Sequence, residues 1–190
     1  MKTTEPIRDK YQITQLVEHY LKRGQVRNHV LIVIAVYTAL RISDLLLLRW
    51  DDVYDFANGR IRRSITLVEK KTGKTKSIAL HASIIAALQC YLDTAKPGTF
   101  LFENPRTGKA LSRTQAYRII RYAAEALGFP TRVSCHSLRK TFGYHAWKDG
   151  KNPELIMKVY NHSSLAITSR YLGITQDDID AVYLDAKLTA

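Results

Sequence analysis

The sequence has few cysteines and no long apolar segment. Its 190 residues include two cysteines, Cys90 and Cys135, too few and too far apart for a disulfide framework or a Cys-x-x-Cys metal site. The longest apolar run, residues 30–40, is shorter than the roughly 20 residues that span a bilayer, and the N-terminus lacks a signal-peptide pattern. These absences exclude disulfide-rich secreted and membrane-spanning proteins. They predict a protein of the reducing cytosol with two buried thiols.

Acidic residues are scarce relative to basic ones. The chain has 17 Asp and Glu against 29 Lys and Arg, which gives a net charge of +12. Its 46% hydrophobic and 24% charged content is ordinary for a globular protein, and its length predicts one domain over residues 1–190 with a single core. The charge favours a polyanionic partner over the alternative, a basic protein without one.

The pattern of apolar residues predicts a mainly helical domain with a small antiparallel β-sheet. Residues 27–40 are apolar on all sides and predict a helix at the centre of the domain. Residues 63–68 have the β-branched content of a strand, and the turn at Thr72-Gly73 predicts a hairpin. The remaining predictions are a loose lead-in at 1–11, a short strand at 100–103, and helices from Thr14 to Gly24, at 44–49 after a Ser43 cap, and at 81–95, 112–128, 135–148, 154–160 and 175–188.

The segment from residue 135 to residue 171 combines two histidines, an arginine and a tyrosine. His136 and Arg139 lie three residues apart, so on a helix they share one face and can meet at one anion. Arg139 can bind a phosphate through two parallel hydrogen bonds, a geometry that lysine does not provide. Tyr171 has an ordinary pKa of about 10 and needs a base to become a nucleophile. His136 is the nearest candidate base.

Four fragments of the sequence occur in the order and at the spacing of one known family. They are A-L-R-I-S-D-L-L-L-L-R-W-D-D-V at 39–53, E-K-K-T-G-K-T-K-S-I-A-L at 69–80, C-H-S-L-R at 135–139, and N-H-S-S followed by S-R-Y-L-G at 161–173. Together they resemble the catalytic domain of the tyrosine recombinase, or phage integrase, family. The resemblance places catalytic residues at Arg41, Lys71, His136, Arg139, His162 and Tyr171, with Asp44 as a supporting acid.

The resemblance implies a site-specific DNA recombinase of the integrase or invertase kind, as found on mobile elements. Such enzymes cleave and rejoin DNA through a 3′-phosphotyrosine link, without metal or cofactor. The implied partners are double-stranded DNA and further copies of the chain, assembled as a tetrameric synapse through the C-terminal helix, residues 175–188. The family's usual N-terminal clamp domain is missing, which indicates either a recombinase with a catalytic domain alone or a fragment.

Basic side chains near these fragments are candidates for DNA contacts. They lie at the hairpin tip and on a helix that is basic along its first three turns: Lys70, Lys74, Arg113, Arg118 and Arg121. Two residues depart from the family pattern. Asn161 stands where glycine usually precedes the second histidine, and Lys140 replaces a histidine. Because asparagine tolerates the left-handed conformation, we expect the turn at Asn161 to be kept.

Three other functions are compatible with parts of this pattern. A metal-dependent nuclease is disfavoured because the acids are scattered and not clustered. A DNA-binding protein of the same fold with weak or no catalysis remains an alternative, although all six catalytic matches are intact. A type IB topoisomerase uses the same chemistry, and the sequence separates it poorly from a recombinase.

Overall fold

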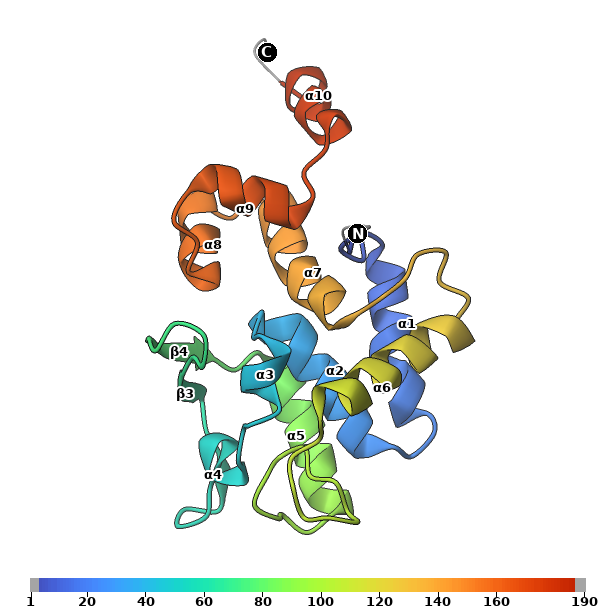
Figure 1. Ribbon diagram of the computed structural model, residues 1–190, viewed down its shortest axis with the longest axis vertical. Coiled ribbons are helices and arrows are strands. Elements are labelled where there is room, and N and C mark those ends of the chain that lie inside the picture. Colours follow the sequence, from blue (N-terminus) through green and yellow to red (C-terminus); the bar gives the residue numbers. More distant parts are fainter. Residues whose placement is uncertain (1–3, 187–190) are drawn as a thin grey trace.

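The computed structural model describes residues 4–186, which form ten helices and four short strands (Figure 1). The helices are α1 (Lys10–Leu21), α2 (Val26–Thr38), α3 (Ile42–Leu45), α4 (Trp50–Val53), α5 (Ala82–Thr94), α6 (Arg113–Ala126), α7 (Cys135–Lys148), α8 (Pro153–Tyr160), α9 (Leu165–Leu172) and α10 (Gln176–Leu184). The strands are β1 (Tyr54–Asp55), β2 (Arg60–Ile61), β3 (Ser64–Val68) and β4 (Thr75–Ala79). The predicted mainly helical fold with a small antiparallel component is confirmed.

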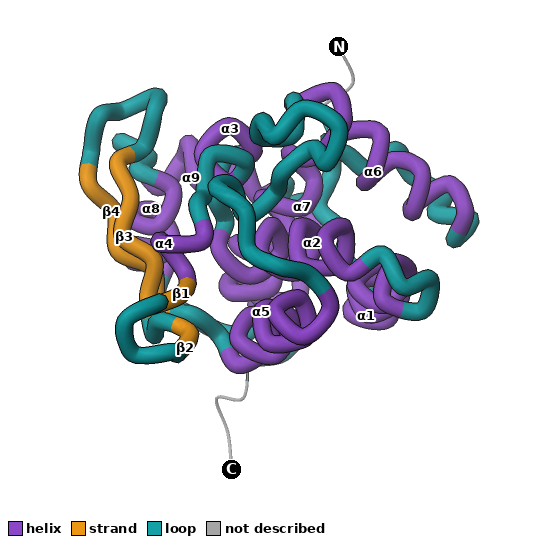
Figure 2. The backbone as a smooth tube through the Cα atoms, turned by 90° about the horizontal axis from the view of Figure 1, so that it is seen from below, coloured by secondary structure: helices purple, strands orange, loops and turns teal. Residues whose placement is uncertain are grey.

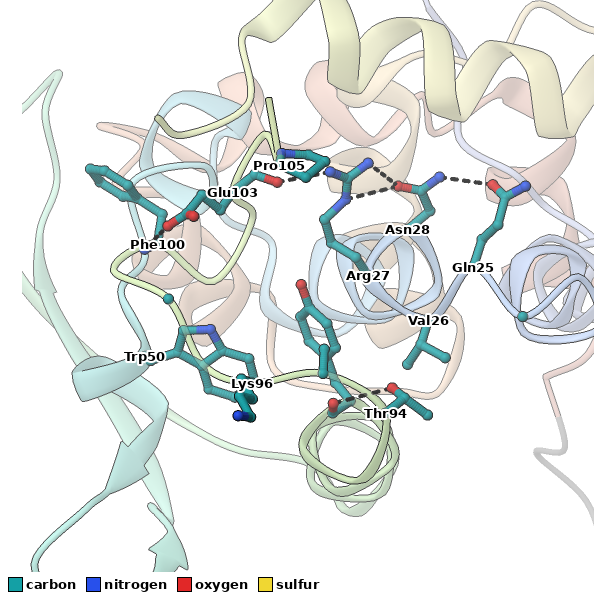
Figure 3. Close-up of a pocket in the computed structure, with 14 residues that line it drawn as sticks. Gln25, Val26, Arg27, Asn28, Trp50, Thr94, Lys96, Phe100, Glu103 and Pro105 are labelled. Carbon is teal, nitrogen blue, oxygen red and sulfur yellow. Dashed lines mark hydrogen bonds between the residues drawn. The ribbon is translucent and has the colours of Figure 1, made fainter. Parts of the chain in front are cut away.

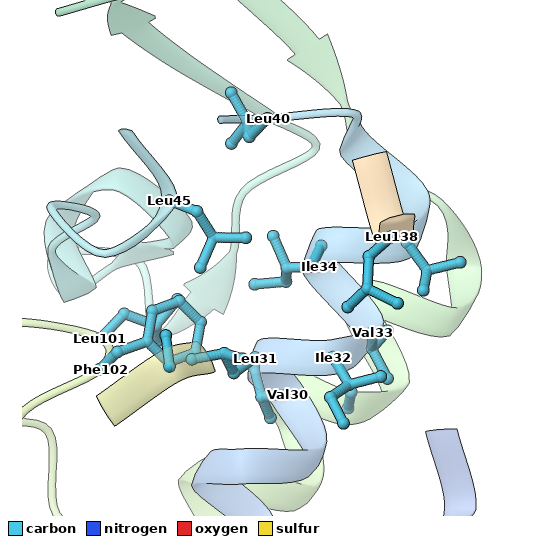
Figure 4. Packing of buried hydrophobic residues seen from close by; sticks show 14 of the residues in the cluster. Val30, Leu31, Ile32, Val33, Ile34, Leu40, Leu45, Leu101, Phe102 and Leu138 are labelled. Atoms are coloured by element: carbon cyan, nitrogen blue, oxygen red, sulfur yellow. The ribbon is translucent and has the colours of Figure 1, made fainter. Parts of the chain in front are cut away.

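Helix α2 is the centre of the main core. Its residues Val30 to Ile34 are all buried, as expected from an apolar surface on every side (Figure 4). Leu101 and Phe102, which are remote in the sequence, pack against this helix, and Leu138 brings α7 onto it. The position of α7 matters most for function, because this helix carries the H-S-L-R sequence.

The strands form two separate antiparallel pairs. In the larger pair, β3 and β4, Leu67 faces Lys76 and Val68 faces Thr75 across the ladder. Burial alternates along β3, with Ile65 fully buried, as one packed face requires. Figure 2 shows all four strands on one side of the molecule, opposite α1 and α6. The β3–β4 hairpin therefore lies at an edge, where Lys76 and Glu69 form hydrogen bonds with residues at the C-terminal end of α8.

A second, smaller core joins α7, α8 and α9. Tyr160 is fully buried, accepts a hydrogen bond of 2.9 Å from the backbone N–H of Gly143 and donates one of 2.5 Å to the carbonyl of Arg139. A Cβ atom at position 143 would lie 2.5 Å from Leu172 and 2.6 Å from the Tyr160 hydroxyl. Only glycine permits this approach of α8 and α9 to α7, and the approach positions the tyrosine-bearing helix.

Several predicted element boundaries are wrong. Helix α1 begins at Lys10 with Asp9 as its cap, so Thr14 lies inside the helix, and the supposedly loose lead-in includes the buried Ile7. Helix α3 begins at Ile42, so Ser43 is not its cap. At α1 both Asp9 and Thr14 can cap a helix, and the earlier residue does so. Helix α3 begins without a side-chain cap after Arg41 and ends at Leu45, so the predicted helix at 44–49 is wrong at both ends.

The predicted strand at 100–103 and the length of the last helix also need correction. Residues 100–103 make isolated bridges, Arg49 with Phe100 and Glu103 with Ala110, and no strand. Helix α10 ends at Leu184 and not at Leu188, and residues 187–190 lie outside the described part. Both cysteines are free and only partly buried. No helix within residues 4–186 has the length and apolar character needed to span a membrane.

Candidate active site

Four of the six predicted catalytic residues line one pocket. Arg41, Lys71, His136 and Arg139 surround a space of about 230 Å³, together with Arg113. They come from three regions: the N-terminus of α3, the β3–β4 turn and the first turns of α7. Five basic side chains around one opening make a site for an anion.

Arg41 reaches the pocket because the chain turns sharply at the end of the central helix. Ala39 has a left-handed backbone with φ of 53°, which ends α2, and Arg41 then precedes α3 in an extended conformation. The guanidinium is held by Glu69, whose Oε1 lies 2.9 Å from Nη1. This partner was not among the residues predicted for the site.

The cap of α7 fixes His136 and Arg139 relative to the pocket. Ser134 and Ser137 form a reciprocal cap, in which each side chain bonds to the other's backbone N–H. His136 remains exposed, whereas Arg139 is 5% exposed and donates to the carbonyl of Ala39. The predicted convergence on one pocket is therefore present, although Arg139 is also part of the protein interior.

The turn between α8 and α9 brings His162 beside Tyr171. Asn161 adopts the left-handed conformation, with φ of 55° and ψ of 40°, as predicted for the residue that replaces glycine. The His162 and Tyr171 rings lie edge to face with their centroids 5.1 Å apart, and Nδ1 of His162 is 3.1 Å from Oγ1 of Thr168. The Tyr171 hydroxyl is buried and has no hydrogen-bond partner among the described residues.

Burial and nearby cations shift the pKa values of the site residues. Partial desolvation by the surrounding protein lowers the pKa of His136 below its usual value although the side chain is exposed, and the charge of Arg139 lowers it further. The pKa of His162 is lowered by burial and by Arg139 and Arg41. Burial raises the pKa of Tyr171, against the opposing charges of the two arginines. Near pH 7 both histidines are therefore neutral and able to accept a proton.

Of the three lysines at the hairpin tip, one lines the pocket and two face solvent. Lys71 lines the pocket, in agreement with the K-T-G match, whereas Lys70 and Lys74 are exposed and stay predictions as DNA contacts. Asp44 accepts a hydrogen bond of 3.1 Å from the backbone N–H of Lys70. The predicted supporting acid thus anchors the hairpin, while Glu69 is the acid that contacts Arg41.

The basic helix α6 has one residue at the pocket. Arg113, at its first position, lines the opening. Arg118 is exposed, and Arg121 pairs with Glu125 through an N–O contact of 2.5 Å. No observation tests the DNA contacts predicted for these three arginines, and Arg113 is the one best placed to reach a bound anion.

Lys140, which departs from the family pattern, is buried and lies with Nζ 5.3 Å from the Tyr171 ring centroid. Two further charged residues near the pocket, Glu69 and Lys76, were missed by sequence reasoning, and Glu69 is fully buried. Lys76 donates a hydrogen bond of 2.7 Å to the carbonyl of Val159, and burial and the charge of Arg139 lower its pKa to about 8. No local signal marks these residues, because charged residues in a lysine-rich hairpin normally face solvent.

A larger cavity of about 530 Å³ lies elsewhere, near α5 (Figure 3). Its polar side chains are largely paired with one another: Arg27 donates to the carbonyl of Glu103 and to Asn28. None of the six predicted catalytic residues lines it. The smaller cationic pocket is therefore the candidate active site.

Solved structures with a similar fold include site-specific recombinases. A XerA recombinase aligns with a TM-score of 0.78 and 20% identity, covering 100% of this chain and 66% of that one. A XerH site-specific recombinase, in a post-cleavage complex with its difH substrate, aligns with a TM-score of 0.75 and 21% identity over 96% of this chain and 53% of that one. The fold is that of the tyrosine recombinase catalytic domain.

The sequence comparisons identify the family. The model of the phage integrase family matches residues 8–177. A "probable integrase/recombinase", YoeC of Bacillus subtilis, is 38% identical over 96% of this chain and 97% of its own length. The tyrosine recombinase XerD of Mycobacterium tuberculosis is 30% identical over 85% of this chain, and the match spans 52% of that longer relative. The chain belongs to the phage integrase family, whose members are site-specific tyrosine recombinases that cleave and rejoin DNA.

Proposed function

We propose that the pocket formed by Arg41, Lys71, His136 and Arg139 binds a DNA phosphate and that Tyr171 attacks it. The observation that carries this proposal is the meeting of four basic side chains at one pocket, from segments up to about a hundred residues apart. His162 and Tyr171 do not line the pocket, but two of its arginines, Arg41 and Arg139, lie close enough to shift the pKa of both. Preorganised cations at the place where charge develops are the largest contribution to many phosphoryl and acyl transfers.

The chemistry is divided among the six residues. Tyr171 Oη forms a bond to phosphorus, the bond from phosphorus to the 5′-oxygen breaks, and a 3′-phosphotyrosine remains. His136 takes the tyrosine proton and Lys71 supplies the proton to the leaving oxygen. Arg41 and Arg139 stabilise the charge on the phosphate oxygens. Attack by a second 5′-hydroxyl on phosphorus then breaks the bond to Tyr171 and reverses the step, and His162 donates a hydrogen bond to the phosphate in both directions.

Double-stranded DNA is the proposed substrate, and the cytoplasm is the proposed place of action. The net charge of +12 supports a polyanionic partner, and the exposed Lys70, Lys74 and Arg118 extend the basic surface beyond the pocket. Incubation with candidate DNA, followed by a denaturing gel, tests the proposal. A covalent protein–DNA adduct is expected, and its absence on every DNA that the protein binds would contradict it.

Cleavage is expected to slow at acidic pH, with a midpoint below 6.5, the ordinary histidine pKa. His136 has a lowered pKa, so it stays neutral to a lower pH than an ordinary histidine and still accepts the Tyr171 proton there. Once His136 is protonated it can no longer accept the tyrosine proton, so the cleavage rate falls as the pH is lowered. Single-turnover adduct formation between about pH 5 and 8 measures this profile.

Two variants check the assignment of that profile. His136→Gln should cleave slowly and without the acidic limb. His81→Asn is the matched control, because His81 stacks on Tyr37 away from the pocket and asparagine also caps helices. A midpoint above 6.5, or an unchanged profile in His136→Gln, would remove His136 as the base.

We also propose that α10 docks on a neighbouring copy of the chain when several copies assemble on DNA. Its apolar residues Ile179, Val182, Tyr183 and Leu184 are between 45% and 83% exposed. Figure 1 shows the helix standing away from the remaining helices. At its root, Asp178 is 7% exposed and pairs with Lys148 and Arg8, so the base of the helix is fixed while its apolar residues lack a partner surface. A tetrameric synapse is the proposed assembly.

Val182→Ser with Leu184→Ser should leave half-site binding intact and weaken cooperative assembly on a duplex with two half-sites by more than about tenfold. Full burial of each apolar side chain is worth about 1.5–3 kcal/mol, and serine provides little of it. Analytical ultracentrifugation on that duplex is the measurement. Asp177→Asn on the same helix is the control, and equal cooperativity in the apolar double variant would show that α10 does not dock in trans.

A further inference from the structure

Glu69, at the end of β3, is a fully buried carboxylate in an otherwise exposed turn. Its exposure is 0%, while its neighbours Val68 and Lys70 are exposed. A buried carboxylate is costly unless other groups pair with it. Such groups are present, and they come from three separate regions of the chain.

The three partners of Glu69 each belong to a region that carries a proposed catalytic residue. Oε1 is 2.9 Å from Nη1 of Arg41. Oε2 accepts hydrogen bonds of 2.8 Å from Thr72, next to Lys71, and of 2.6 Å from the Asn161 side chain, next to His162. One carboxylate therefore connects the arginine, the hairpin tip and the histidine turn.

The geometry at Arg41 leaves room for a substrate. Although Nη1 and Oε1 are 2.9 Å apart, neither atom has a hydrogen-bond partner, so their contact is an ion pair without an aligned N–H···O bond. The guanidinium is thus held by charge through a nitrogen that is itself buried. The Arg41 side chain as a whole is 22% exposed and lines the pocket, so its exposed part is available to a phosphate there.

Glu69 is ionised in the folded protein. Burial alone would raise its pKa, but the hydrogen bonds from Thr72 and Asn161 and the charges of Arg41 and Lys76 together lower it. The negative charge that holds Arg41 is accordingly present at neutral pH.

We propose that Glu69 is a positioning residue, which orients Arg41 for the phosphate and ties the Lys71 turn and the His162 turn to it through Thr72 and Asn161. This inference rests on the proposed role of the pocket in DNA cleavage. It also gives Asn161 a function beyond its backbone conformation: its side chain carries the link to the histidine turn, which glycine at that position does not make.

Two substitutions separate the parts of this network. Glu69→Gln keeps the size of the side chain and removes the charge that holds Arg41. Asn161→Gly keeps the left-handed backbone, which glycine adopts readily, and removes the link to Glu69. At saturating DNA, cleavage should fall about a hundredfold in Glu69→Gln, as for a misplaced catalytic group, and about tenfold in Asn161→Gly. The dissociation constant for DNA should change less than about twofold in both.

The cleavage rate of a double variant at Glu69 and Asn161 gives a sharper test. If both residues act through one network, the double variant should cleave about as slowly as Glu69→Gln alone, because the two effects are not additive. Glu18→Gln, which disrupts a surface pair with Lys22 on α1, is the matched charge control and should cleave like the unaltered protein. Cleavage by Glu69→Gln at or above the unaltered rate would overturn the proposal.

Hydrogen exchange tests the connection without relying on cleavage. The N–H of His162 donates to the carbonyl of Met157, and it should exchange faster in both Glu69→Gln and Asn161→Gly. Unchanged exchange in both variants would overturn the positioning role even if the protein formed no adduct with DNA. An absent adduct in the unaltered protein would instead overturn the proposed function, so the two failures are distinguishable.

Discussion

Tyr171→Phe is expected to abolish the covalent adduct with DNA, with a loss of at least about 10⁴-fold in cleavage, while DNA affinity stays nearly the same. The substitution keeps the ring that packs against His162 and removes only the attacking oxygen. The buried Tyr171 hydroxyl makes no hydrogen bond of good geometry among the described residues but lies near the charge of Arg139, so its loss should change the thermal midpoint little. A denaturing gel and a binding isotherm on the same DNA measure the two effects.

The neighbouring tyrosines provide the controls. Tyr183 is 77% exposed on α10, so Tyr183→Phe should form the adduct normally. Tyr160→Phe should also keep a nucleophile but lose stability, because the backbone groups of Gly143 and Arg139 lose their buried partner, at about 1–3 kcal/mol for each unsatisfied group. Adduct formation by Tyr171→Phe would mean that another residue is the nucleophile.

Arg139→Lys should be severely impaired, with cleavage reduced about 10²- to 10³-fold, the range found when one preorganised donor to a developing charge is removed. Lysine keeps the charge but not the two-pronged geometry that suits a phosphate. The same arginine donates to the carbonyl of Ala39 and lies with its guanidinium carbon 4.8 Å from the Tyr160 ring centroid, so a loss of stability is expected as well. Cleavage must therefore be compared well below the melting temperature of the variant.

Arg60→Lys is the matched control, since Arg60 is 74% exposed on β2 and has no proposed role in DNA binding, and it should cleave at the normal rate. Addition of a chelator should leave the unaltered protein active, because side-chain cations are proposed to stabilise the phosphate. Full activity of Arg139→Lys, or loss of activity with chelator alone, would contradict the mechanism in which arginines bind the phosphate.

Spacing along one helix was the most reliable guide to the site. His136 and Arg139 were predicted to share a pocket because residues three apart lie on the same helix face, and both do line it. The left-handed turn at Asn161 was predicted from residue type and is present. Predictions of helix starts were poorer at Thr14, because Asp9 is a second polar residue that can cap the helix, and at Ser43, because α3 starts after Arg41 without a side-chain cap.

The acid that contacts Arg41 illustrates what sequence reasoning missed. The family pattern directed attention to Asp44, which anchors the hairpin through the Lys70 N–H instead. Glu69 lies in a run of lysines and a glycine, where a charged side chain normally faces water. Its burial is supported by a hydrogen bond from Asn161, which lies 92 residues further along the chain, and a pattern of neighbouring residues cannot reveal a contact at that separation.

By itself the sequence determined the class of fold, the helix that forms the core, and the residue types available for phosphodiester chemistry. These properties depend on hydrophobic periodicity and on the intrinsic chemistry of side chains, which are local. Only the tertiary structure decided which cations share the pocket, that Glu69 holds Arg41, and that Tyr171 lies buried beside His162. Those arrangements depend on the packing of α7, α8 and α9 around Gly143 and Tyr160, where distances between remote segments are set by shape and burial.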